Sequence, residues 1–291
     1  MMKRAALALL LACAAALSLH APAAMAAAGD AAQRNMSPTD DPQASVIWQK
    51  IRAGLFEGRP IADPPPGLLV LEAPRRAIDA AVVPVAIHTR MPAGSEVWVR
   101  RIVLVLDANP SPIVGIFGFT PDSGRADVET RIRVDAYGWI RAVAETSDGK
   151  LYAVTHFIKA SGGCSAAATG DAAAAAATLG RMRLRVEGDA QGSEPVAVQL
   201  VIEHPNDSGM VMDQATRQYV PPHYVRQVQV SYDGRPVFSA DVDFGIAENP
   251  NFRFYVRPHK GGDAGGELRA TMVDTSERQF SVAQPLAGAA R

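Results

Sequence analysis

One cysteine in the chain, Cys164, has a setting that suits covalent chemistry at sulfur. It follows Ser161-Gly162-Gly163 and precedes Ser165, within a stretch of small residues. Paired glycines leave the backbone free, so we expect a mobile, exposed thiol. The other cysteine, Cys13, lies in an apparent export signal, so the exported chain keeps a single thiol without an intramolecular partner.

A cysteine enzyme needs a base held close to its sulfur, and a flexible glycine arm cannot hold one. We therefore expect no catalytic residue, and a thiol that is presented to the active sites of other proteins. Cys164 is the expected attachment point, on an arm formed by Ser161, Gly162, Gly163 and Ser165. A buried packing cysteine and an intermolecular disulfide are the alternatives.

The sequence contains few motifs for other kinds of catalysis or for cofactor and metal binding. It contains no Walker loop, no dinucleotide fingerprint and no G-x-S-x-G motif, so no permanently bound cofactor is expected. No histidine stands at ligand spacing from a cysteine or an acid, so no metal site is expected either. The histidines are His20, His88, His156, His204, His223 and His259.

The N-terminus has the pattern of a cleaved signal peptide over residues 1–26. Lys3 and Arg4 precede an apolar run, and Ala24-Met25-Ala26 fits a cleavage site. We expect a soluble periplasmic protein. The formal net charge is −1, and losing Lys3 and Arg4 makes it slightly more acidic, which gives no reason to expect a nucleic-acid or membrane partner.

Hydrophobic periodicity predicts one helix followed by many strands. After a disordered leader over 27–40, Asp41-Pro42 begins a helix in which Val46, Ile47, Ile51 and Leu55 recur at helical spacing. Strands are predicted over 68–71, 82–89, 97–106, 113–119, 126–134, 139–145 and 151–158. This spacing predicts a first domain over 41–159 that is an immunoglobulin-like antiparallel β-sandwich.

Residues 160–180 are almost wholly small and predict an Ala/Gly-rich arm and linker. A second sandwich domain is predicted over 181–284, with a disordered tail over 285–291. Its strands are expected over 181–186, 196–203, 224–232, 236–240, 252–256, 267–273 and 279–282. The fold class is therefore all-β, and the arginines Arg181, Arg183, Arg185, Arg253 and Arg257 are expected on solvated strand faces.

These features resemble the sulfur carrier of thiosulfate oxidation in a fused SoxY–SoxZ form. Ser161-Gly162-Gly163-Cys164-Ser165 stands where SoxY has a Gly-Gly-Cys swinging arm. The second half resembles SoxZ in four segments, which span 202–210, 220–225, 233–237 and 249–254. Fused chains of this kind resemble a group of carriers associated with periplasmic quinoprotein dehydrogenases.

The resemblance implies that Cys164 bears sulfur intermediates and presents them to Sox-type enzymes or c-type cytochromes, while the SoxZ-like half pairs with the SoxY-like half. Here the cysteine is internal, so its arm is tethered at both ends. The alternative function is a non-catalytic accessory module for a quinoprotein alcohol dehydrogenase. A thiol redox enzyme is less favoured, because the chain has no C-x-x-C motif.

Overall fold

The computed structural model describes residues 35–92, 95–168, 172–188, 190, 192, 194–214, 216–258 and 266–286. The predicted signal peptide over 1–26, the first part of the predicted leader and the tail from 287 lie outside the described residues. At the start of the described chain, Met36 donates its N–H to the Tyr137 carbonyl at 2.8 Å, and the Asn35 side chain accepts the Tyr137 N–H at 2.9 Å.

The N-terminal helix forms where the periodicity predicts it. A 3₁₀ turn η1 (Pro42–Ala44) leads into α1 (Val46–Leu55), whose first turn is capped by the Ser45 hydroxyl on the Trp48 N–H at 3.3 Å. The apolar face of α1 packs on the outer face of a sheet, against Val103, Val105, Val143 and Leu151. Within the described residues, neither α1 nor α2 (Ala172–Thr178) is long and apolar enough to span a membrane.

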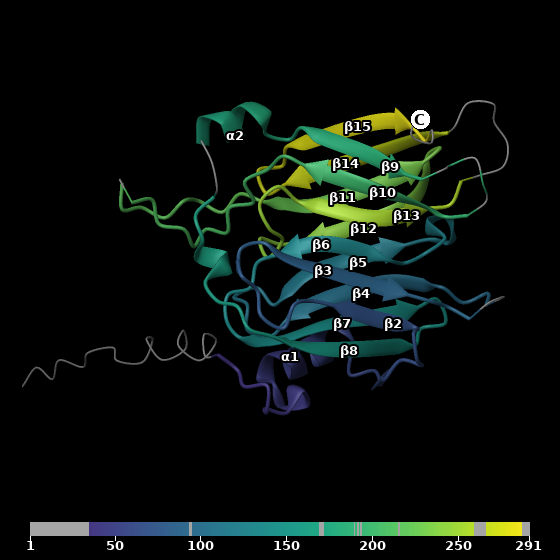
Figure 1. Ribbon diagram of the computed structural model, residues 1–291, viewed down its shortest axis with the longest axis horizontal. Coiled ribbons are helices and arrows are strands. Elements are labelled where there is room, and N and C mark those ends of the chain that lie inside the picture. The colour runs from purple at the N-terminus through teal and green to yellow at the C-terminus, as the bar shows by residue number, and fades with distance from the viewer. Residues whose placement is uncertain are drawn as a thin grey trace, which may run out of the picture. The chain divides into compact units, whose positions relative to one another are not determined.

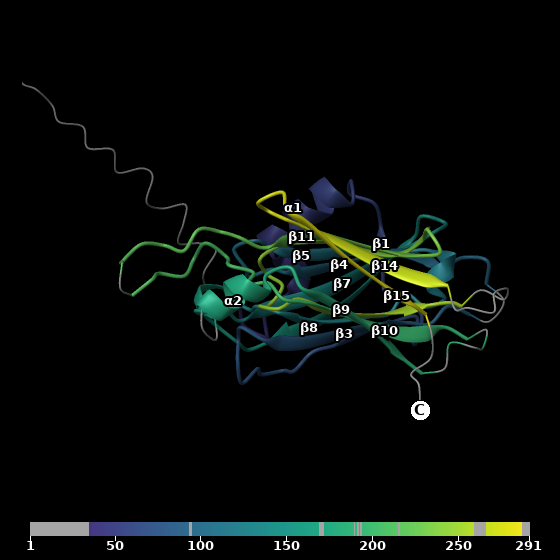
Figure 2. The same ribbon diagram turned by 90° about the horizontal axis from the view of Figure 1, so that it is seen from above.

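In the described part of the chain the strands form two sheets, which Figure 2 shows lying one over the other, with β11 and β5 in one and β3 and β10 in the other. The nine-stranded sheet runs in the order β1 (Ile61–Ala62), β8 (Leu151–Ile158), β7 (Gly138–Thr146), β4 (Val99–Leu106), β5 (Ile113–Phe119), β12 (Arg235–Val242), β11 (Val225–Tyr232), β14 (Glu267–Asp274), β15 (Gln279–Pro285). The six-stranded sheet runs in the order β2 (Leu69–Glu72), β3 (Val83–Thr89), β6 (Val128–Ile132), β13 (Asn251–Val256), β10 (Val196–Ile202), β9 (Met182–Glu187).

Both sheets continue from the first half of the chain into the second (Figure 1). β5 pairs with β12 in antiparallel register from Phe119↔Phe238 to Gly115↔Val242. β6 meets β13 at the Glu129↔Arg253 pair, where Arg253 forms ion pairs with Glu129 at 2.5 Å and Glu187 at 2.8 Å. The two halves therefore share backbone hydrogen bonds as well as side-chain contacts.

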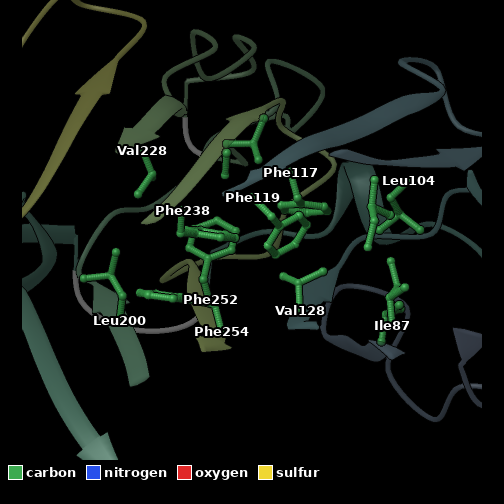
Figure 3. Close-up of a cluster of buried hydrophobic side chains, with 14 of the residues drawn as sticks. Ile87, Leu104, Phe117, Phe119, Val128, Leu200, Val228, Phe238, Phe252 and Phe254 are labelled. Atoms are coloured by element: carbon green, nitrogen blue, oxygen red, sulfur yellow. The ribbon is translucent and has the colours of Figure 1, made fainter. Parts of the chain in front are cut away.

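The core is also shared between the halves. Phe238 of β12 stacks on Phe254 of β13 with ring centroids 4.4 Å apart, and it contacts Phe119 and Phe117 of β5 at 5.8 and 6.3 Å. Figure 3 shows these rings between Ile87, Leu104 and Val128 of the first half and Leu200 and Val228 of the second. Aromatic side chains contribute strongly to core energetics, so this cluster joins the halves into one packing unit.

The all-β prediction is confirmed, and each predicted strand forms within a few residues of its expected bounds. The sequence patterns missed β1, a short strand that pairs in parallel with β8. Arg181, Arg183 and Arg185 are exposed as expected, whereas Arg253 is ion-paired at the junction between the halves. The immunoglobulin-like connectivity and the domain boundaries remain predictions.

We predict that Phe238→Ala destabilises both halves together. Removing a buried ring should lower the free energy of unfolding by about 3–5 kcal/mol, and the shared core should keep unfolding a single transition. Urea unfolding followed by circular dichroism and by tryptophan fluorescence measures both effects. Tyr219→Ala, at a ring 63% exposed, is the control; separate transitions for the two halves would contradict the shared core.

Candidate functional site

The segment that carries Cys164 is docked by backbone hydrogen bonds. It leaves β8, passes through Gly162 with φ of +81°, and forms a 3₁₀ turn η3 (Gly163–Ser165). The Gly162 N–H donates to the Asp135 carbonyl at 2.8 Å, and the Gly163 N–H donates to the Val134 carbonyl at 2.9 Å. We call residues 161–165 the arm.

Cys164 is buried, with 0% of its surface exposed, so the expectation of an exposed thiol is wrong, while its mobility remains a prediction. The reason lies in Gly163. A Cβ placed there would lie 2.1 Å from the Ala80 carbonyl oxygen and 2.8 Å from the Val134 nitrogen. Gly163 therefore allows a close approach of backbones. Only Ser161, Gly162 and Ser165 of the arm are exposed.

The second half of the chain completes the seat of the arm. The Ser208 hydroxyl donates to the Cys164 carbonyl at 2.5 Å and accepts the Met210 N–H at 3.1 Å. Ser208 belongs to the loop between β10 and β11, and Figure 1 shows this loop at the same end of the sheets as the connection that contains α2. The thiol thus lies where the two halves meet.

Asn206 fixes this loop from the inside. It is fully buried and has a positive φ of 52°, a conformation that asparagine tolerates better than most residues. Its N–H donates to His204 Nδ1 at 3.0 Å, its side-chain amide donates to the Ile246 carbonyl at 3.0 Å, and its side-chain oxygen accepts the Val225 N–H at 2.9 Å. These bonds place Ser208 against the arm.

Arg133 connects the same loop to the first half. Its buried guanidinium donates to the carbonyls of Asn206 and Phe244, with longer contacts at 3.4 Å to those of Pro205 and Ile246. Burial lowers the pKa of Arg133, while the charges of Cys164, Asp207 and Glu248 oppose that change. Arg133 is thus a buried cation beside the thiol. Its guanidinium is bound mainly by carbonyl oxygens.

The surroundings of Cys164 favour the neutral thiol. Burial, with the charges of Asp135 and Asp243, raises the pKa of Cys164 to about 12, although the charge of Arg133 opposes the rise. A thiolate is the form of cysteine that acts as a nucleophile. The docked arm therefore holds the sulfur in an unreactive form.

A second cluster of titratable groups lies behind the loop. His204, His223 and Asp274 have potential ligand atoms within 4.8 Å of one another. Sequence spacing could not bring them together, because they lie on three separated segments. His223 Nε2 is 2.9 Å from Asp274 Oδ2, and Arg278 Nε donates to the same oxygen at 2.9 Å.

The hydrogen bonds of this cluster argue against a metal centre. His204 Nδ1 accepts the Asn206 N–H, so a neutral ring carries its proton on Nε2 and offers no lone pair there. Metal-bound histidines instead donate from their other nitrogen. The Arg278 guanidinium contacts both Asp274 and His223. The cluster is better described as an anchor for the loop that carries Ser208.

Sequence reasoning identified Cys164 but missed the residues that hold it. Ser208 and Asn206 lie within the segment 202–210 that resembles SoxZ, which was the available signal. Arg133 lies between the apolar residues Ile132 and Val134, an alternation typical of a solvated strand position, yet it is buried. A contact between halves that are distant in sequence leaves no local pattern.

Comparison with known families divides the chain at the arm. The family model for sulfur oxidation protein SoxY matches residues 53–164, and the model for sulphur oxidation protein SoxZ matches residues 182–284. The first match ends at Cys164, and the second contains Ser208. No curated protein matches the chain.

Two solved structures resemble part of the chain. The sulfur carrier protein SoxY from Chlorobium limicola f thiosulfatophilum is 25% identical over 39% of this chain and 91% of its own, with a TM-score of 0.32. A superoxide reductase (neelaredoxin) from Ignicoccus hospitalis is 16% identical over 38% of this chain and 90% of its own, with a TM-score of 0.29. TM-scores this low establish neither a shared overall fold nor a shared function.

We predict that Gly163→Ala undocks the arm without unfolding the sheets. The added methyl collides with the Ala80 backbone, which should shift the docking equilibrium at least about tenfold toward the open arm. The alkylation rate of Cys164 measures this shift. Gly54→Ala, where the new Cβ would meet no atom within 4 Å, is the matched control, and an unchanged rate in Gly163→Ala would contradict the close packing.

We also predict that the protein becomes less stable as the pH is lowered, because His204 then takes up a proton. Burial, together with the charge of His223, lowers the pKa of His204 to about 4. Between about pH 6.5 and 4 the unfolded chain therefore binds the proton more readily, so the folded state loses on the order of 3 kcal/mol as the pH falls. Urea unfolding across this range measures the loss. His204→Gln should weaken this dependence and leave the part that comes from the lowered pKa of His156, whereas His88→Gln should retain it in full.

Proposed function

Because the chain is a fused SoxY–SoxZ-like protein, we propose that it is a periplasmic carrier that binds sulfur intermediates covalently on Cys164. The proposal is supported mainly by the observation that both halves of the chain position this residue. Cys164 ends the SoxY match, and its carbonyl accepts a hydrogen bond from Ser208 of the SoxZ match. A carrier needs one thiol that both halves can position.

The chemistry at Cys164 requires an oxidant supplied by a partner. When thiosulfate is attached, a bond forms between Cys164 Sγ and the outer sulfur of thiosulfate. The thiol proton passes to solvent, and two electrons pass to an oxidant such as a pair of c-type haems. The product is a cysteine S-thiosulfonate. Partner enzymes then process its terminal sulfonate group.

The protein itself acts as the carrier in this scheme, with catalysis by its partners. The raised pKa of the docked thiol fits this division, because a self-sufficient cysteine nucleophile needs a depressed pKa. We propose Sox-type enzymes or c-type cytochromes as the partners, and no resident cofactor. Export rests on the sequence of residues 1–26.

The adduct provides the test. Protein incubated with thiosulfate and a periplasmic extract of its native cell should gain the mass of one thiosulfonate group, and a reductant should remove it. Cys164→Ala and Cys164→Ser should fold normally and gain nothing, as intact-mass spectrometry would show. A wild-type thiol that stays bare, or an adduct that persists in Cys164→Ala, would refute the proposal.

A further inference from the structure

β8 forms an outer edge of the nine-stranded sheet that is paired only at its two ends. In the described part of the chain, its side away from β7 pairs with β1 at Leu151 and Tyr152. Just after β8, the Lys159 N–H donates to the Arg75 carbonyl at 2.9 Å, and the Lys159 carbonyl accepts the Ala77 N–H at 3.2 Å. Figure 1 shows β8 at the lower margin of the sheets.

The residues between these two pairings present free backbone groups. Successive residues of a strand point their N–H and C=O groups to alternate sides, so Thr155 and Phe157 share the outer side with Lys159. Within the described residues, neither forms a backbone hydrogen bond on that side. The β1 pairing ends at Ala62, because Pro64, the next residue in position to donate to β8, has no N–H.

This edge also lacks the features that usually prevent pairing with another chain. Exposed edge strands are commonly protected by charged residues, by proline or by a bulge. β8 reads LYAVTHFI, and its register with β7 is uninterrupted. Only its end residues Leu151 and Ile158 are buried, and the rest are half-buried or exposed. Such a strand is a template to which an extended peptide can add.

A hollow of about 470 Å³ adjoins the free part of this edge. It lies between β8, the end of β1 and the N-terminal helical segment. It is lined by residues 153–155 and 61–64 and by Pro42, Gln43, Trp48 and Arg52. There is therefore space beside β8 for the side chains of an added strand.

The charges around the open edge favour an acidic chain. The Nε of Arg52 in the hollow is buried and has no hydrogen-bond partner among the described residues. At the other end of the open stretch, Arg75 is exposed and Lys159 is half-buried. Asp63 also lines the hollow, but it is exposed, so water screens its charge. Cations at both ends attract a partner of opposite charge.

We propose that the open edge of β8 binds an extended acidic segment of another protein, which adds a strand to the sheet and places a carboxylate against Arg52. A second copy of this chain fits less well. Antiparallel pairing of two β8 edges would bring Arg75 and Lys159 of each copy toward Arg52 of the other, and like charges placed opposite each other are destabilising. This inference goes beyond the proposed function and does not depend on chemistry at Cys164.

Hydrogen exchange in the free protein tests whether the edge is open. NMR on ²H,¹⁵N-labelled protein should show the amides of Thr155 and Phe157 exchanging at least about tenfold faster than those of Val154 and His156, which face β7. Equal protection of the two pairs of amides would show that the edge is already covered and would overturn the proposal.

A synthetic peptide tests the occupant. The probe is a short N-acetylated peptide in which valine and glutamate alternate, so that its glutamates share one face of an extended strand. At saturation it should slow exchange of the Thr155 and Phe157 amides at least about tenfold and leave Val154 unchanged. The same peptide N-methylated at alternate residues cannot complete the backbone pairing, and a version with lysine for glutamate meets like charge, so both should bind more weakly.

Three outcomes of the peptide experiment would overturn the proposal. The first is no effect of the acidic peptide at millimolar concentration, and the second is an equal effect of all three peptides. The third is protection of Thr155 that rises with protein concentration in the absence of peptide, which would identify a second copy of this chain as the occupant. None of these results bears on the formation of an adduct at Cys164.

Arg52 gives a separate test of the carboxylate contact. Arg52→Gln should raise the Kd of the acidic peptide about tenfold, equivalent to about 1.4 kcal/mol, and should reduce the salt dependence of binding. Lys50→Gln, at an exposed position of the same helix, is the matched control, and circular dichroism checks the fold of both variants. Equal Kd values in Arg52→Gln and Lys50→Gln would overturn the contact on which the choice of an acidic partner depends.

Discussion

The position of the thiol depends on the way Arg133 and its neighbours bind the two halves together. Next to the Ile132↔Ile246 bridge, the Arg133 N–H donates to the Gly245 carbonyl at 2.7 Å, and the guanidinium binds the loop that carries Ser208. The following residue, Val134, accepts the Gly163 N–H. One short segment thus holds the second half on one side and the arm on the other. Loss of either contact would weaken the seat of Cys164, which the Gly162 N–H and the Ser208 hydroxyl also hold.

This arrangement gives a physical reason for the two halves to lie in one chain. Continuous sheets and a shared phenylalanine cluster keep the halves in fixed register, so that Ser208 can meet the carbonyl of Cys164. Cys164 belongs to the SoxY match, but its carbonyl is held by a residue of the SoxZ match. A cysteine tethered at both ends has a shorter reach than one on a free tail, and burial between the halves limits its exposure further.

The sequence predicted the local structure well and the long-range structure poorly. Alternating residues such as Met182, Leu184 and Val186 report strand faces directly, because side-chain direction alternates along a strand. The joining of β5 to β12, by contrast, is a pairing across more than a hundred residues that leaves no local signature. The glycines beside Cys164 fit two opposite roles, free movement and close packing, and only the contact of Gly163 with Ala80 distinguishes them.

The most direct test of a docked but releasable thiol is the alkylation rate of Cys164 in the native, unloaded protein, compared with the urea-unfolded chain. The structure predicts that the native protein is labelled at least about a hundredfold more slowly than the unfolded chain, and that labelling goes to completion without global unfolding. When opening of the arm limits the rate, the rate should become independent of reagent concentration. Labelling as fast as in the unfolded chain would contradict the docked arm. Labelling only at the rate of global unfolding would contradict its release.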